Sequence, residues 1–145
     1  MIPPFVKDGD LPPGIHQATW LEFQSRFCIF AHSDRRLKFC EAIEQLVIAS
    51  HTSGIIEQLI IAGSFVTAKQ EPNDYDAVLI FRASVDVIKL PPFQLDLVDG
   101  ARSRLRFRGD IFPVRSGTDR ANKLLSGFQR TRLGKAVGVV EVFLT

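Results

Sequence analysis

Apolar residues along the chain switch between the three- and four-residue spacing of helices and the short continuous runs of buried strands. Helical spacing over residues 34–51 predicts a helix, with Ser33 as its N-cap and Gly54 at its end. Continuous apolar runs at 58–62 and 75–81 predict two buried strands. These elements form the expected core of the fold.

The segments before this core carry different signals. The first eighteen residues contain Pro3, Pro4, Pro12 and Pro13, which predicts an extended arm without regular structure. Directly after it, Thr19 and Glu22 have the spacing of a capping box, which predicts a short helix over residues 20–27.

The second half of the chain is less clearly patterned. Alternating arginines in residues 93–106 fit a strand, whereas a stripe of leucine and valine fits a helix. We favour a helix to 105 followed by a strand at 107–114, because a crossover between strands of one sheet needs such an element. Thr118 is expected to cap a helix to 128, and residues 137–144 to form a closing strand.

This order of elements predicts an α+β fold: a small mixed sheet with helices packed on one side. With 145 residues, 46% of them apolar, we expect a single domain over residues 19–145, preceded by the arm of residues 1–18. Neither a bilayer-spanning run nor a signal-peptide pattern is found in the sequence, which predicts a cytoplasmic protein without membrane contact.

Two features of the composition bear on chemistry. Cys28 and Cys40 form no C-x-x-C pair and have no paired histidine nearby, so the sequence indicates neither a zinc nor a redox motif and favours two buried, reduced thiols. The net charge of +2 is too small to indicate a nucleic-acid ligand by itself. Lys and Arg nevertheless outnumber Asp and Glu in the last third of the chain.

The strongest candidate for chemistry is a Gly-Ser pair followed by two acids. Gly63 and Ser64 end the first apolar run, where a glycine allows close backbone approach and a serine offers a hydroxyl to phosphate. Asp74 and Asp76 stand at the start of the second run, and alternation along a strand points them the same way. Two carboxylates on one face repel each other, and a divalent cation relieves that repulsion.

This arrangement resembles the signature of the polymerase-β-type nucleotidyltransferase superfamily, especially its minimal members. The resemblance implies a nucleotidyltransferase-like fold in which the Gly63-Ser64 turn holds a triphosphate. It also implies that Asp74 and Asp76 bind Mg²⁺ or Mn²⁺ and that a third acid on a later strand completes the site. Asp110 matches that third position best, since it follows a glycine and lies in an apolar strand.

Other residues compete for roles or extend the site. Three further acids, Asp86, Asp96 and Asp99, are alternatives for the third ligand. Lys69 lies between the turn and the acids, where an ammonium group could meet the triphosphate. His16 could lie near the site, but a single histidine in a proline-rich arm is more often packed or solvated. The arginines at 102–108 fit equally a basic rim that attracts a nucleotide or an RNA end and a solvated face.

The resemblance implies metal-dependent transfer of a nucleoside monophosphate from a nucleoside triphosphate to a hydroxyl acceptor. The acceptor is a protein side chain, an RNA end or a small molecule, and minimal members often pair with a small helical partner in a toxin–antitoxin-like system. One alternative is an inactive nucleotide-binding or antitoxin-like module of the same fold. Another is a nucleic-acid-binding domain that uses the basic C-terminal third.

Overall fold

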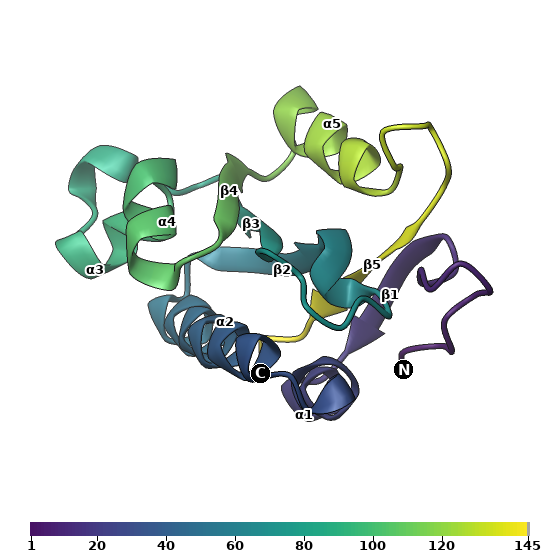
Figure 1. Ribbon diagram of the computed structural model, residues 1–145. Coiled ribbons are helices and arrows are strands. Elements are labelled where there is room, and N and C mark those ends of the chain that lie inside the picture. Colours follow the sequence, from purple (N-terminus) through teal and green to yellow (C-terminus); the bar gives the residue numbers. More distant parts are fainter. Residues whose placement is uncertain (145) are drawn as a thin grey trace.

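A five-stranded mixed sheet forms the centre of the computed structural model, which describes residues 1–144 (Figure 1). The strands are β1 (Gly14–Ala18), β2 (Ile56–Ala62), β3 (Asp76–Phe81), β4 (Asp110–Arg115) and β5 (Gly138–Val142). Their order in the sheet is β1-β5-β2-β3-β4. The outer pairs β1/β5 and β3/β4 are parallel, and β2 is antiparallel to both of its neighbours. The predicted α+β class with a mixed sheet is confirmed.

Five α-helices pack around this sheet. They are α1 (Trp20–Phe23), α2 (Asp34–Ser53), α3 (Pro92–Leu95), α4 (Gly100–Phe107) and α5 (Asp119–Phe128). Among residues 1–144, no helix combines the length and the apolar character needed to cross a membrane.

The helices cover both faces of the sheet, which corrects the expectation that they pack on one side. α1 and α2 lie against the face that contains Leu59 and Leu79, whereas α5 packs on the opposite face against Ile60 and Val78 (Figure 1). These four side chains, from adjacent positions of β2 and β3, are all fully buried. Central strands that are apolar on both sides require cover on both faces.

The predicted helix ends are confirmed in the first half of the chain. Thr19 and Glu22 form the reciprocal capping box of α1. Ser33 caps α2 by accepting a hydrogen bond from the Arg36 N–H, and Gly54 ends the helix in the left-handed conformation, with φ +69°. Beyond α1 the chain continues as a π-helical turn over Gln24–Cys28.

The expectation that residues 1–18 lack regular structure is wrong for their last part. Gly14–Ala18 forms β1 and pairs in parallel with β5, which comes from the other end of the chain. The edge of β5 offers free N–H and C=O groups, and an already extended segment can satisfy them at little conformational cost. The proline-containing part continues this attachment, since Leu11 is buried and its carbonyl accepts a hydrogen bond from Gly138 N–H at 3.1 Å.

The connection between β3 and β4 is helical, as favoured above, but it is divided into α3 and α4. The predicted strand also begins later than expected, at Asp110, because the buried Phe107 is the last residue of α4. Parallel β3 and β4 start side by side, with Asp76 paired directly to Asp110. The helical crossover therefore places two acids at one end of the sheet.

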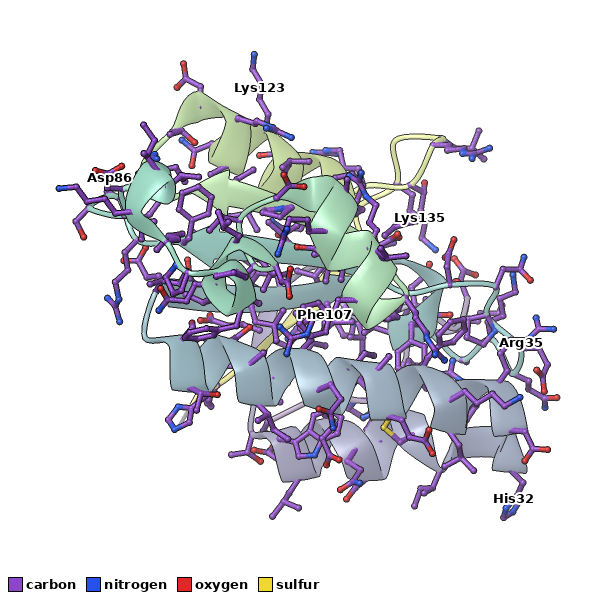
Figure 2. The ribbon with its side chains drawn as sticks, turned by 90° about the vertical axis from the view of Figure 1, so that its left-hand side faces the viewer. His32, Arg35, Asp86, Phe107, Lys123 and Lys135 are labelled. Atoms are coloured by element: carbon purple, nitrogen blue, oxygen red, sulfur yellow. A yellow bond between two sulfur atoms is a disulfide. The ribbon has the colours of Figure 1, made fainter. Side chains whose placement is uncertain are left out.

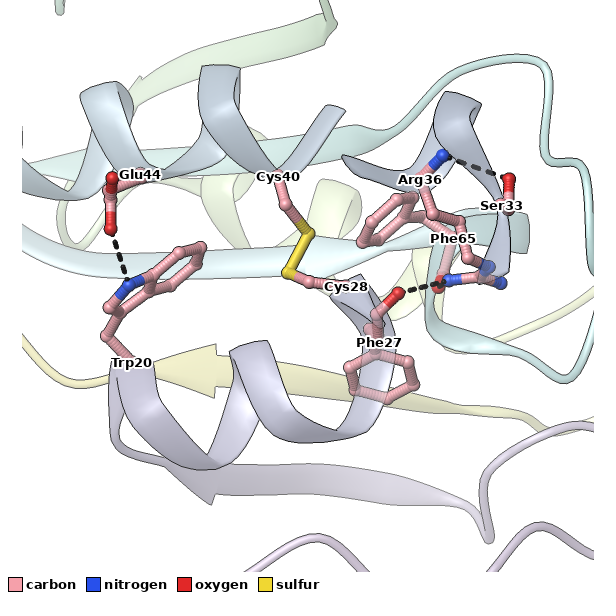
Figure 3. Close-up of a disulfide and its surroundings, with 8 residues drawn as sticks. All are labelled: Trp20, Phe27, Cys28, Ser33, Arg36, Cys40, Glu44 and Phe65. Carbon is pink, nitrogen blue, oxygen red and sulfur yellow. Dashed lines mark hydrogen bonds between the residues drawn. A yellow bond between two sulfur atoms is a disulfide. The ribbon is translucent and has the colours of Figure 1, made fainter. Parts of the chain in front are cut away.

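The prediction of two reduced cysteines is wrong, because Cys28 and Cys40 form a disulfide (Figure 3). Cys28 ends the π-helical turn and Cys40 lies on the second turn of α2, with 5.7 Å between the Cα atoms. The sequence contained no C-x-x-C signal for this pair. Only the packing of the turn against α2 brings the two sulfur atoms together.

Candidate active site

Three carboxylates meet where β3 and β4 begin. Asp76 and Asp110 are the first residues of these strands and are register partners, and Asp74 precedes β3 by two residues. One oxygen atom from each of the three carboxylates lies within 4.8 Å of the others. The expected convergence of Asp110 with Asp74 and Asp76 is confirmed, and residues 1–144 contain no second group of this kind.

The Gly63 turn lies directly beside these acids. Ala62, the last residue of β2, pairs with Asp76, so the 3₁₀ turn Gly63–Val66 begins next to that carboxylate. Gly63 has φ +77°, and a Cβ atom there would stand 2.2 Å from Asp76 Oδ2. From sequence, this glycine was expected to allow close approach of a ligand; in the structure, its missing side chain makes room for the Asp76 carboxylate.

A second glycine positions Asp110. A Cβ atom on Gly109 would lie 2.4 Å from the ring of Tyr75, which is fully buried and donates its hydroxyl to the Phe107 carbonyl. Asp110 N–H in turn donates to the Tyr75 carbonyl at 2.9 Å. Tyr75 stands between the first two acids in sequence, so its packing fixes the third acid relative to them.

Asp74, Asp76 and the Gly63 turn open into one cleft of about 750 Å³. Gly63, Ser64 and Lys69 line one side of it, together with Asp74 and Asp76. Most of the remaining lining comes from the N-terminal arm, from the end of α5 and from the segment that follows it, and includes Asp10, Leu11, Phe128, Arg130, Thr131 and Arg132. Sequence reasoning missed these residues. The basic C-terminal third was the only signal, and it did not show which of its residues would reach the cleft.

Mutual repulsion and burial both act on the acids. Burial, followed by the charges of Asp74 and Asp110, raises the pKa of Asp76 to about 6. Burial also raises the pKa of Asp74, with further contributions from a hydrogen bond and charge repulsion with Asp110, while the Lys69 ammonium acts in the opposite direction. At neutral pH the site therefore concentrates negative charge in a partly desolvated position.

These residues fit a hard divalent cation. Carboxylate oxygens are the ligands that Mg²⁺ and Mn²⁺ prefer. Magnesium–oxygen distances are about 2.0–2.1 Å, so two opposite ligands of one ion are roughly 4 Å apart. The 4.8 Å spread of the three carboxylates is close to that value. A cation at this place would also remove the repulsion that raises the pKa of Asp76.

The competing acids serve local structure elsewhere. Asp86 caps a 3₁₀ turn and pairs with Lys89, and Asp99 caps α4. Asp96 forms ion pairs with Arg102 and Arg106. Figure 2 shows Asp86 at the opposite end of the molecule from Arg35, which contacts the loop next to Asp74.

The remaining candidates are also separate from the cleft lining. The residues 102–108 are largely helical, which settles the strand alternative, and the guanidinium of Arg104 lies over the Phe112 ring, 5.4 Å from its centroid. Nε2 of His16 lies 2.6 Å from the Pro12 carbonyl oxygen, a hydrogen bond within the N-terminal segment. Of the candidates Lys69, His16 and the arginines at 102–108, Lys69 alone is part of the cleft lining.

A protein-family model described as a family of unknown function, DUF6932, matches residues 3–143, so the chain belongs to that family. No curated protein matches the chain. No solved structure matches it either.

Proposed function

We propose that this protein transfers a nucleoside monophosphate from a nucleoside triphosphate to a hydroxyl acceptor, with a divalent cation. One observation carries the proposal: Asp74, Asp76 and Asp110 converge, and the first two line the same cleft as the Gly63-Ser64 turn. A purely structural acid cluster would not need a glycine turn packed onto one carboxylate at the mouth of a cleft of about 750 Å³. That volume lies within the range of small-molecule and cofactor sites, about 300–1,000 Å³.

Each side of the cleft has a role in this reaction. Gly63 and Ser64 hold the β- and γ-phosphates, and the Lys69 ammonium pairs with the same anionic tail. Asp74, Asp76 and Asp110 provide the ligands for Mg²⁺ or Mn²⁺. When bound, the cations neutralise charge on the phosphates and lower the pKa of the acceptor hydroxyl.

The transfer itself exchanges one phosphorus–oxygen bond for another. The acceptor oxygen attacks the α-phosphorus, the bond from that phosphorus to the bridging oxygen breaks, and pyrophosphate leaves with the bonding electrons. Asp110 takes the proton of the acceptor hydroxyl. Positioning and charge neutralisation supply most of the rate gain, because the protein forms no covalent intermediate.

The acceptor in this proposal is a macromolecule that brings its own binding surface, either a protein side chain or an RNA end. A small helical protein partner in a toxin–antitoxin-like pair fits the same reasoning. We place the activity in the cytoplasm, where nucleoside triphosphates are abundant. Cytosolic thiols are kept reduced, so the Cys28–Cys40 disulfide would there be formed only transiently.

The test is incubation with each of the four α-³²P-labelled nucleoside triphosphates, Mn²⁺ or Mg²⁺, and lysate. A labelled protein or RNA band that disappears with EDTA and with Asp76→Asn is the expected result. Asp86→Asn serves as a matched control, because it removes an acid far from the cleft and should leave labelling intact. Binding of triphosphate without any labelled product would favour the inactive module instead.

A further inference from the structure

The first turn of α2 holds the loop that connects the Gly63 turn to the acids. Arg36, a residue that no motif singled out, is completely buried in this turn. Its guanidinium donates to the carbonyls of Phe65 at 2.8 Å and Thr67 at 3.0 Å, and to the carbonyl of Lys69 from both Nε and Nη2. Three carbonyls within five residues of the loop therefore point at one side chain.

A fourth carbonyl anchors the same group from another element. Arg36 Nη1 donates to the Phe27 carbonyl at 3.1 Å, next to the disulfide-bonded Cys28 (Figure 3). The guanidinium carbon also lies 4.8 Å from the centroid of the Phe65 ring. Burial lowers the pKa of Arg36 to about 10, which still leaves it charged at neutral pH. A buried charge with this many acceptors is tightly fixed in position.

The neighbouring Arg35 holds the far end of the loop. Its Nη1 donates to Asn73 Oδ1 at 3.2 Å, and its Nε lies 3.5 Å from Glu71 Oε2. Asn73 directly precedes Asp74. Arg35 is exposed, so its contacts are weaker than those of Arg36. Together the two arginines contact the loop at alternate positions from residue 65 to residue 73.

We propose that Arg36 is a positioning residue for the triphosphate side of the site: it sets Ser64 and Lys69 opposite the acids. This inference rests on the proposed function. Asp76 and Asp110 are held by the pairing of β3 with β4 and by Gly109, whereas Asp74 lies two residues before β3. The hydrogen bonds of Arg36 go to backbone carbonyls and to none of the three acids. Loss of the guanidinium therefore affects phosphate binding far more than cation binding. A purely structural arginine would affect both alike.

Arg36→Lys keeps the charge and removes the planar fork that reaches several carbonyls. The test measures binding of Mn²⁺ alone and of inorganic tripolyphosphate with Mn²⁺ by calorimetry, which avoids any assumption about the nucleobase. We expect Mn²⁺ affinity to stay within about twofold and tripolyphosphate affinity to fall about tenfold or more, as one or more charge-assisted hydrogen bonds are lost. Arg82→Lys is the matched control, because Arg82 donates to the Gly54 carbonyl at the other end of α2.

Two further measurements test the same inference if the Arg36→Lys variant is unstable. Amide hydrogen exchange should accelerate across residues 64–70 in Arg36→Lys and stay slow in β3. In Arg36→Ala, methylguanidinium should restore tripolyphosphate binding and methylammonium should not. Equal tripolyphosphate affinity in wild type and Arg36→Lys would overturn this inference alone. A wild type that does not bind tripolyphosphate with Mn²⁺ would overturn the proposed function together with it.

Discussion

Two charged clusters flank the loop of residues 63–73, and they are built in opposite ways. On one side, the single positive charge of Arg36 is completely buried and donates hydrogen bonds to four carbonyls. On the other, the carboxylates of Asp74, Asp76 and Asp110 crowd together, and the Lys69 ammonium offsets the rise in the pKa of Asp74 only in part. The guanidinium of Arg36 has its hydrogen bonds made within the fold, whereas the three carboxylates repel one another.

Under the proposed function, this difference separates a structural charge from a ligand-binding one. A buried ion with all its hydrogen bonds made holds its surroundings in one arrangement, and its removal leaves carbonyls without donors. Crowded like charges lower stability until a counterion arrives, and such sites are retained where they have a function. Removing a charge should therefore destabilise the first cluster and leave the second as stable as before, or more so.

The largest expected effect is on activity at the acid cluster. Asp76→Asn should reduce label transfer by at least about 10²–10³-fold, the cost of losing one preorganised electrostatic group. The melting temperature should stay the same or rise, because the change removes like-charge repulsion and keeps the shape of the side chain. Transfer assays and thermal unfolding on the same preparation check both. Loss of folding would instead make Asp76 a structural residue.

For Arg36, a loss of stability is expected. Arg36→Met should lower the free energy of unfolding by about 3–5 kcal/mol, because the carbonyls around it lose their donor. Urea unfolding measures this difference, with Arg35→Met as the exposed control at the adjacent position, expected to lose less than about 1 kcal/mol. A variant of Arg36 as stable as wild type would break the comparison between the clusters.

The Cys28–Cys40 disulfide lies next to Phe27, whose carbonyl accepts a hydrogen bond from Arg36, and should stabilise this part of the fold. Its two cysteines are 12 residues apart, and closing a loop of this size stabilises a fold by about 3 kcal/mol. A double variant, Cys28→Ser with Cys40→Ser, should lose about that much in urea unfolding while its affinity for Mn²⁺ stays unchanged. Alkylation of freshly lysed cells, followed by mass spectrometry, shows whether the bond exists where the protein acts. Weaker Mn²⁺ binding in the double variant would mean that the two clusters are coupled.

Binding of a nucleoside triphosphate and Mn²⁺ at the three acids should stabilise the folded chain. At a concentration 100 times the dissociation constant, a nucleoside triphosphate with Mn²⁺ should add about 2.7 kcal/mol to the free energy of unfolding, because it binds only the folded chain. Differential scanning fluorimetry with ATP, CTP, GTP and UTP measures the shift in melting temperature. EDTA should remove most of it. No shift with any triphosphate counts against the site.

The smallest expected effect is a dependence of stability on pH without metal. The pKa of Asp76 is about 6 in the folded chain and near 4 when unfolded, so the folded state binds more protons between these values. Stability from this group therefore falls as the pH rises from about 4 to about 6, and then stays level. Thermal unfolding at several pH values should show this decline in wild type and a smaller one in Asp76→Asn. Mn²⁺ should reverse it above pH 6.

Local patterns in the sequence predicted most of the elements around these clusters. The capping box of Thr19 and Glu22, the Ser33 cap and the Gly54 end are all confirmed, because caps depend on a few neighbouring residues. The apolar runs that became β2 and β3 were equally clear. Strand β1 was missed, because its pairing partner lies more than a hundred residues away in sequence.

The sequence also predicted only part of the candidate site. Asp74 and Asp76 share a short motif, and their common direction follows from strand alternation. The sequence could only rank Asp110 above its rivals, and the parallel register of β3 and β4 is what places it beside Asp76. Arg36 carried no signal at all, since an arginine next to another arginine at a helix start is typical of a solvated surface.

What the sequence determined by itself was the set of local elements and a motif of two acids behind a Gly-Ser turn. The tertiary structure alone decided the cover of both sheet faces, the disulfide, the third acid and the burial of Arg36. The physical reason is the distance along the sequence between the residues that interact. Caps, turns and alternation depend on residues within a few positions of each other, whereas burial and charge crowding depend on which distant segments the packed core brings together.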